Sequence, residues 1–104
     1  MYKIPDQNNL YGTISNVESK KALADMFGAC GWRVRKSTWT DFEVGTDWSE
    51  ITIESEEHNP LINGVIDPAM FDDFRHLLNS FGVRYSLELY NDEKTLIKEE
   101  KSEN

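Results

Sequence analysis

Hydrophobic residues in this chain follow two different periods, and the order in which the periods alternate limits the folds available to it. In segments 16–30 and 68–81, apolar side chains recur every three or four positions. That spacing is typical of an amphipathic helix, whereas alternation with a period of two is typical of a strand with one buried face. The segments around the two helical regions alternate with a period of two. The pattern therefore predicts an α+β fold.

The first helical segment begins with a capping signal. Ser15 and Glu18 have the S-x-x-E spacing in which two side chains satisfy free backbone N–H groups at a helix start. On the helix that follows, Cys30 falls on the buried apolar stripe and Lys20 points away from it. These features predict a helix over 16–30.

The second helical segment carries stronger signals at both ends. Asp67 is an N-cap residue, and Pro68 after it suits the first helical position. Gly82 supplies the C′ residue that ends a helix in the left-handed conformation. The sequence predicts a helix over 68–81.

Strand-like alternation accounts for most of the remaining chain. The predicted strand regions are 10–14, 32–44, 50–54 and 83–90. The region 32–44 is compatible with one long bent strand or with two shorter strands broken near Ser37–Trp39. Asn63-Gly64 is typical of a tight turn with two positive φ angles, the alternative being an ordered loop before the second helix.

The resulting order β-α-β-β-α-β predicts a ferredoxin-like split β-α-β sandwich, with two helices on one face of an antiparallel sheet. Thr95–Ile97 is a candidate for an extra C-terminal edge strand. Residues 1–104 are expected to form a single domain, with 1–9 as a loose lead-in and 99–104 as a charged tail. The other face of the sheet must be solvated, paired with a second copy or used for binding.

Negative charge is concentrated in the middle of the chain. The formal net charge is −8, and residues 37–74 contain no Lys or Arg. Their acidic residues are Asp41, Glu43, Asp47, Glu50, Glu54, Glu56, Glu57, Asp67, Asp72 and Asp73. Such a segment either keeps the protein soluble or attracts a cationic partner.

Two tryptophans lie among these carboxylates, which favours the second interpretation. The predicted partner-binding residues are Trp39, Asp41, Glu43, Asp47, Trp48, Glu50, Glu54, Glu56 and Glu57. Tryptophan is enriched at interface hot spots, and acidic groups steer a basic partner toward its site. The alternatives are that Trp39 packs along an edge or under a loop and that Trp48 covers the core.

The sequence contains no recognisable catalytic or metal-binding motif. Cys30 is the only cysteine, so an intrachain disulfide and a four-cysteine zinc site are excluded. His58 and His76 lack the ligand pattern of a metal site, and phosphate-loop and hydrolase motifs are absent. We expect no catalytic residue, metal or cofactor. The negative charge disfavours nucleic acid, no apolar run reaches the ~20 residues that span a bilayer, and we expect a cytoplasmic protein.

These observations predict a small acidic module that neutralises or regulates a basic protein partner, acting as a monomer or a weak homodimer through its open sheet face. In size, charge and lack of catalytic groups it is similar to bacterial immunity and antitoxin-type inhibitors of cationic nuclease toxins. The likeness implies occlusion of the toxin's active site. One alternative is a homodimeric ferredoxin-like domain that binds a small molecule or acts as an enzyme. Another is an inhibitor or scaffold for a non-basic target.

Overall fold

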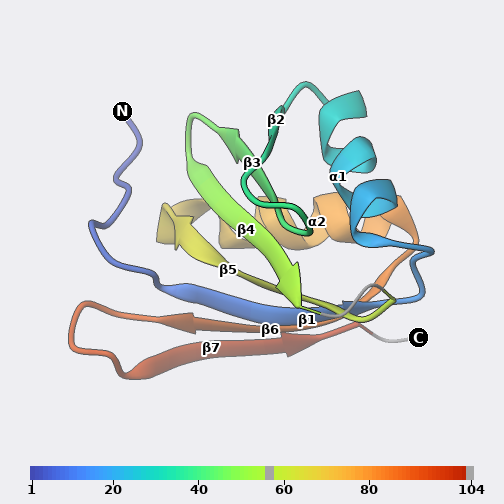
Figure 1. Ribbon diagram of the computed structural model, residues 1–104. Coiled ribbons are helices and arrows are strands. Elements are labelled where there is room, and N and C mark those ends of the chain that lie inside the picture. The colour runs from blue at the N-terminus through green and yellow to red at the C-terminus, as the bar shows by residue number, and fades with distance from the viewer. Residues whose placement is uncertain (56–57, 103–104) are drawn as a thin grey trace.

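An antiparallel sheet of seven strands runs through the protein and carries two helices (Figure 1). The computed structural model describes residues 1–55 and 58–102. The elements in chain order are β1 (Leu10–Ser15), α1 (Lys20–Ala29), β2 (Arg33–Lys36), β3 (Phe42–Thr46), β4 (Ser49–Ser55), β5 (Pro60–Ile66), the 3-10 turn η1 (Pro68–Met70), α2 (Phe71–Phe81), β6 (Arg84–Tyr90) and β7 (Leu96–Lys101). The predicted α+β class is confirmed.

The strands lie in the spatial order β2-β3-β4-β5-β1-β6-β7. Between the helices the chain forms a meander of β2, β3, β4 and β5, where the predicted order β-α-β-β-α-β has two strands. β1 lies between β5 and β6 and is antiparallel to both, so the connection through α2 crosses over β1. The strand count is larger than predicted, and the ferredoxin-like split β-α-β arrangement is not confirmed.

Two local features explain the additional strands. The region 32–44 breaks into β2 and β3, which resolves the alternatives in favour of two strands. Asn63 and Gly64 lie inside β5 and have no positive φ, so the predicted tight turn is wrong. Gly64 is needed for close strand packing instead, because a Cβ there would overlap the backbone carbonyl oxygen of Glu50 in β4.

Helix α1 begins later than the capping signal predicted. Ser15 completes β1 and pairs with Arg84, and the residue after it does not have a helical backbone, so no helix starts there. The chain turns at Asn16, whose φ is 62°, and the N-cap is Ser19, whose Oγ accepts a hydrogen bond from the Ala22 N–H at 3.0 Å. The N-cap of the helix is therefore Ser19, four residues after the Ser15 that the S-x-x-E pattern predicted.

The shifted helix start changes the surroundings of two residues. Lys20 enters the first turn and is buried, with 3% of its surface exposed, where the sequence predicted a solvated position. Cys30 follows the last helical residue and is exposed, so its predicted place on the buried stripe is wrong.

The signals around α2 are confirmed, with a 3-10 turn added at its start. Asp67 accepts a hydrogen bond from the Ala69 N–H at 3.0 Å, and Gly82 ends the helix with a φ of 75°. A second backbone bond, from the Lys3 N–H, and the one from Ala69 together lower the pKa of the Asp67 carboxyl. The hydrogen bond from the Lys3 N–H to Asp67 also holds the N-terminal segment against the start of this helical region.

Both helices cover the same face of the sheet, as predicted. The Phe27 ring of α1 lies 6.1 Å from the Phe74 ring of α2, and Trp32 lies 4.9 Å from Phe27. The other large, fully buried side chains of this core are Phe71, Leu10, Ile14, Leu23, Ile51, Ile53, Ile62, Ile66, Leu78 and Leu87. Within the described residues, no helix covers the opposite face, which is therefore open.

The two ends of the chain are more ordered than predicted. Residues 1–9 have no regular secondary structure, but Asn9 is buried and bonds to the Ile66 backbone. At the other end, β7 continues to Lys101, so residues 99–101 belong to an edge strand and not to a tail. Charged side chains on this strand and on β2 at the opposite edge disfavour edge-to-edge pairing with another sheet.

Candidate protein-binding site

The structure separates the predicted partner-binding residues into three places. Glu43, Glu50 and Glu54 share the open face of the sheet, because each alternates with an inward-facing residue of β3 or β4. Trp39 and Asp41 lie in the loop between β2 and β3, and Asp47 and Trp48 lie in the turn between β3 and β4. Glu56 and Glu57 lie outside the described residues.

The sequence pattern predicts, from pleat alternation along 32–44, that Trp39, Asp41 and Glu43 all point to the face opposite the helices. It holds for Glu43, which lies inside a strand, but not for Trp39 and Asp41, which lie in a loop. Trp48 packs against the core with its ring 5.2 Å from the Trp32 ring, which supports the alternative that it covers the core. Trp39 is 91% exposed and packs neither along an edge nor under a loop.

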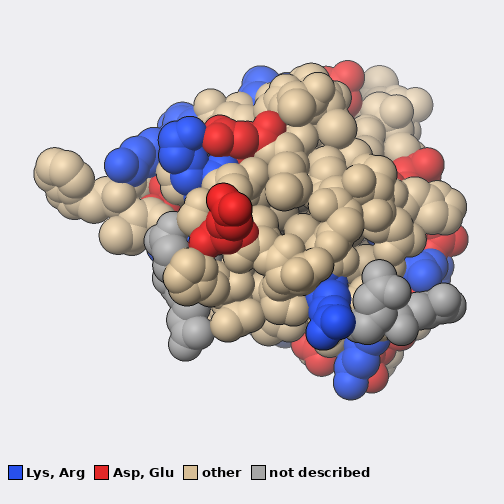
Figure 2. All heavy atoms as spheres, turned by 90° about the vertical axis from the view of Figure 1, so that its right-hand side faces the viewer, with Lys and Arg blue, Asp and Glu red and all other residues tan. Residues whose placement is uncertain are grey.

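Three of the predicted carboxylates have cationic partners within the chain. The pairs and their nitrogen–oxygen distances are Lys20–Asp41 at 3.6 Å, Arg33–Glu50 at 3.1 Å and Arg35–Glu43 at 2.8 Å. All three cations come from the basic first third of the sequence. The side of the molecule on which α1 lies shows acidic groups next to basic ones and not one continuous acidic area (Figure 2).

Two other carboxylates on the open face are held by neutral donors. Glu54 accepts a hydrogen bond from the Asn63 side-chain amide at 2.8 Å, and Glu88 accepts one from the Tyr90 hydroxyl at 3.1 Å. This bond and the negative charge of Glu88 raise the pKa of Tyr90. Within the described part of the chain, neither carboxylate forms a salt bridge. Glu54 and Glu88 are therefore oriented without being neutralised.

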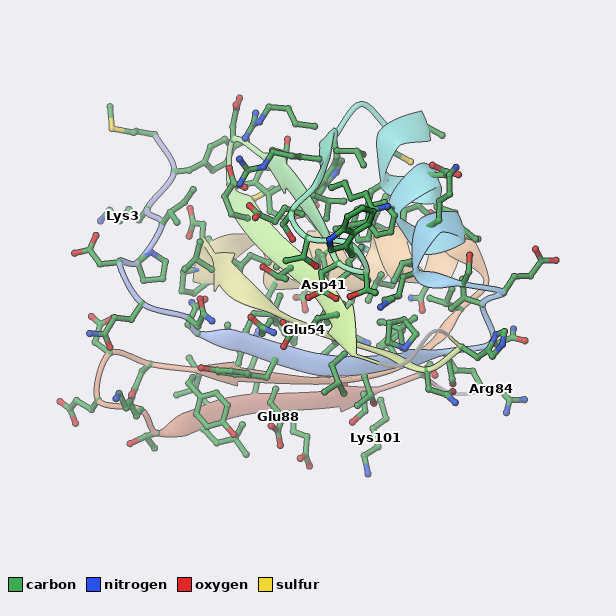
Figure 3. All side chains as sticks on the ribbon, in the orientation of Figure 1. Lys3, Asp41, Glu54, Arg84, Glu88 and Lys101 are labelled. Atoms are coloured by element: carbon green, nitrogen blue, oxygen red, sulfur yellow. The ribbon has the colours of Figure 1, made fainter. Side chains whose placement is uncertain are left out.

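A groove on the open face connects these two carboxylates. It has a volume of ≈420 Å³ and is lined by Tyr11, Gly12, Thr13, Glu54, Leu61, Ile62, Asn63, Ser86 and Glu88. No Lys or Arg is among these described lining residues. In Figure 3, Glu54 lies above β1 and Glu88 lies below it, so the groove crosses the middle of the sheet.

A second depression continues the groove toward the N-terminal segment. It has a volume of ≈690 Å³, shares Tyr11 and Glu88 with the first, and is also lined by Asp6, Tyr90 and Lys94. The rings of Tyr11 and Tyr90 meet edge to face, with centroids 5.7 Å apart. The two depressions adjoin at Tyr11 and Glu88, so aromatic surface and carboxylates lie together there, and Lys94 is the one cation among the described lining residues.

The sequence did not single out several of these residues. Glu88 and Tyr11 lie outside the acidic middle segment, in strands far apart in the chain. Alternation in β1 and β6 shows that both point away from the core, so the signal for their exposure was present. What the sequence lacked was the strand order, which places β1 beside β6.

The residues considered for other chemistry do not contribute to this site. His58 and His76 are exposed and line neither depression. Among the described residues, no group of three His, Cys, Asp or Glu side chains is arranged to hold a metal ion. Neither helix within the described ranges combines the length and apolarity that crossing a membrane requires.

Comparisons of the chain with protein-family models, with curated proteins and with solved structures found no match. The α+β architecture and the groove on its open face are therefore interpreted from physical chemistry alone.

Proposed function

We propose that this protein binds a basic protein partner through the open face of its sheet. The observation that carries the proposal is the contrast between two groups of carboxylates. Asp41, Glu43 and Glu50 face cations of the same chain, whereas Glu54 and Glu88 are held by neutral donors beside a groove. The second pair is available to an external cation.

The physical chemistry of the groove supports a cationic ligand. A carboxylate that is already oriented loses little conformational freedom when it accepts a charge-assisted hydrogen bond. The formal net charge of −8 adds long-range attraction, which speeds association with a basic protein and makes it sensitive to salt. Tyr11, which is 41% exposed, offers an aromatic surface between the two carboxylates.

The narrower form of the proposal is that the partner is a cationic nuclease-type toxin and that this protein neutralises it. In this mechanism Glu54 and Glu88 would occupy positions that substrate phosphates take on the toxin, and Trp39 would supply an apolar contact outside the groove. The small size and strong negative charge of the chain support this form.

The proposal can be tested by affinity capture from an extract of the native cells. The immobilised proteins are the wild type, the double variant Glu54→Gln/Glu88→Gln and the charge-matched control Glu18→Gln/Glu93→Gln. We expect the wild type and the control to retain the same basic protein at low ionic strength, and the double variant to lose it. High ionic strength should weaken capture by the wild type and by the control.

Equal capture of that protein by all three chains would contradict the proposal. The alternative of a homodimeric small-molecule-binding or enzymatic domain would gain support if sedimentation showed a dimer at low micromolar concentration that fails to bind any basic protein. A captured partner that is acidic or neutral would instead support the interpretation as an inhibitor or scaffold for a non-basic target.

A further inference from the structure

We infer that the groove recognises an extended segment of the partner in which two Lys or Arg side chains, four residues apart, flank an apolar residue. This inference rests on the proposed function and specifies its ligand. It follows from the positions of Glu54 and Glu88, from the surface between them and from the charges around them.

The spacing of the two carboxylates sets the spacing of the two cations. Glu54 is on β4 and Glu88 is on β6, and β5 and β1 lie between them. Three strand spacings place β4 about 14 Å from β6. The register aligns Glu54 with Leu61, Thr13 and Ser86, so Glu88 lies two residues, about 7 Å, further along, and the two backbone positions are about 16 Å apart. An extended chain advances about 3.3 Å per residue, so residues i and i+4 lie about 13 Å apart and point to the same side. A segment that crosses the strands diagonally thus brings one cation to each carboxylate, because long Lys or Arg side chains span the remaining few ångströms.

The surface between the carboxylates is suited to an apolar side chain. Leu61 of β5 pairs with Thr13 of β1, and both line the groove. Leu61 and Tyr11 are 40% and 41% exposed, so contact with residue i+2 of the segment would remove apolar surface from water. The aliphatic stems of the two basic side chains would cover the remainder.

The charges on β6 and β7 provide a further argument for a cation at Glu88. Glu88 pairs across the strands with Glu99, which places two carboxylates directly opposite each other. Like charges in this position destabilise a sheet, and a cation bound between the two carboxylates would remove their repulsion. Lys101 pairs with Ser86, two residues along β6 from Glu88, so it lies diagonally across from Glu88 without forming a salt bridge to it, and Arg84 lies further along the strand (Figure 3).

The edges of the sheet are less suitable for such a segment. β2 has the sequence Arg-Val-Arg-Lys, so it presents positive charge along one edge and repels a basic chain. β7 presents both signs of charge. A basic segment is therefore directed to the face of the sheet and does not extend it as an additional strand.

The inference is tested with three synthetic peptides and the full chain labelled with ¹⁵N. The first peptide has the sequence Ser-Lys-Ser-Leu-Ser-Lys-Ser, with blocked ends. The second has the same composition with the two lysines adjacent, and the third has both lysines acetylated. We expect the first peptide to bind roughly tenfold more tightly than the second and to shift the amide signals of Tyr11, Thr13, Leu61 and Ser86.

Two protein variants separate the role of charge from that of the apolar surface. Glu54→Gln/Glu88→Gln should weaken binding of the first peptide roughly tenfold or more. Leu61→Ser, which keeps the charge, should weaken it about threefold. Thermal unfolding of each variant checks that it remains folded, and Leu61→Thr, which retains strand propensity, replaces Leu61→Ser if that variant unfolds.

The outcomes distinguish this inference from the proposed function. If charge removal weakens binding of both lysine peptides equally and Leu61→Ser has no effect, the spacing rule is wrong while binding of a basic partner stands. If the acetylated peptide binds as well as the first, or no peptide shifts the groove signals, the inference is overturned. The affinity capture described above then decides the proposed function independently.

Discussion

The side-chain ammonium of Lys20 lies 3.6 Å from the carboxylate of Asp41, and the pair joins the first turn of α1 to the loop between β2 and β3. The Lys20 side chain is 4% exposed and that of Asp41 is 24% exposed. Asp41 was predicted to contact a partner, but in the fold it faces a buried cation. If Asp41 bound a partner, the buried ammonium of Lys20 would have less negative charge beside it. We therefore assign Asp41 a structural role.

The first prediction follows from this pair. Asp41→Ala should lower the free energy of unfolding by about 1–3 kcal/mol, because it removes a carboxylate that faces a buried ammonium. Asp47→Ala is the control, since Asp47 is exposed in the next turn and its change should stay within about 0.5 kcal/mol. Urea denaturation measures both values. Equal free energies of unfolding for the two variants would contradict a stabilising role of the Lys20–Asp41 pair.

The second prediction concerns the anchor of the N-terminal segment. The Asn9 side chain donates a hydrogen bond to the Ile66 carbonyl and accepts one from the Ile66 N–H, both at 2.9 Å and both buried. Asn9→Ala leaves two buried backbone groups without partners and should cost about 2–3 kcal/mol. Asn8→Ala, at a neighbouring exposed side chain, should cost much less. Thermal unfolding compares them, and a similar loss in both would contradict the assigned role.

The third prediction tests whether the sheet keeps an unfavourable charge pair near the groove. Glu99→Lys replaces the repulsion with Glu88 by attraction and should stabilise the fold by about 0.2–1 kcal/mol. Glu93→Lys makes the same charge change in the turn between β6 and β7 and should stabilise less. Under the proposed function, only Glu99→Lys should also weaken binding of the Ser-Lys-Ser-Leu-Ser-Lys-Ser peptide strongly. Destabilisation by Glu99→Lys would argue against the cross-strand repulsion.

The fourth prediction concerns pH. The hydrogen bond from the Tyr90 hydroxyl to Glu88 raises the pKa of Tyr90, with further contributions from burial and from the charge of Glu99. Because the folded-state pKa lies above that of the unfolded chain, this bond stabilises the fold below about pH 10 and is lost as pH rises through the folded-state value.

Ultraviolet titration of the phenolate band checks this shift. Subtracting the curve of Tyr90→Phe from that of the wild type isolates Tyr90, which should ionise at a higher pH than free tyrosine. In Glu88→Ala, which removes the acceptor, the same residue should ionise closer to its ordinary pKa. An unchanged titration in Glu88→Ala would exclude the hydrogen bond as the main cause.

Local signals predicted the parts of the fold that depend on neighbouring residues. The start and end of the second helix were correct because Asp67 and Gly82 act within one turn of the helix they bound. The start of α1 was misplaced because pairing of Ser15 with Arg84, in a strand far along the chain, competes with a helix cap. The tight turn predicted at Asn63-Gly64 was wrong because pairing with distant strands again outweighs the local signal. Both residues pair with β4 on one side and β1 on the other, which holds them in a strand.

The candidate site was predictable only in part. Alternation indicates that Glu43, Glu50 and Glu54 point away from the core residues of their strands, but it could not show that Arg35 and Arg33 neutralise the first two. Nor could it place Glu88 with Glu54, because their strands are separated by two others that come from different parts of the chain.

The sequence by itself determined the α+β class, the capped second helix, the negative net charge and the alternation that leaves one sheet face polar. The tertiary structure decided the strand order and, with it, which charges meet. The physical reason is the short range of the interactions involved. A helix cap acts over one turn, whereas neutralisation of a carboxylate depends on the cation that long-range strand pairing brings within a few ångströms.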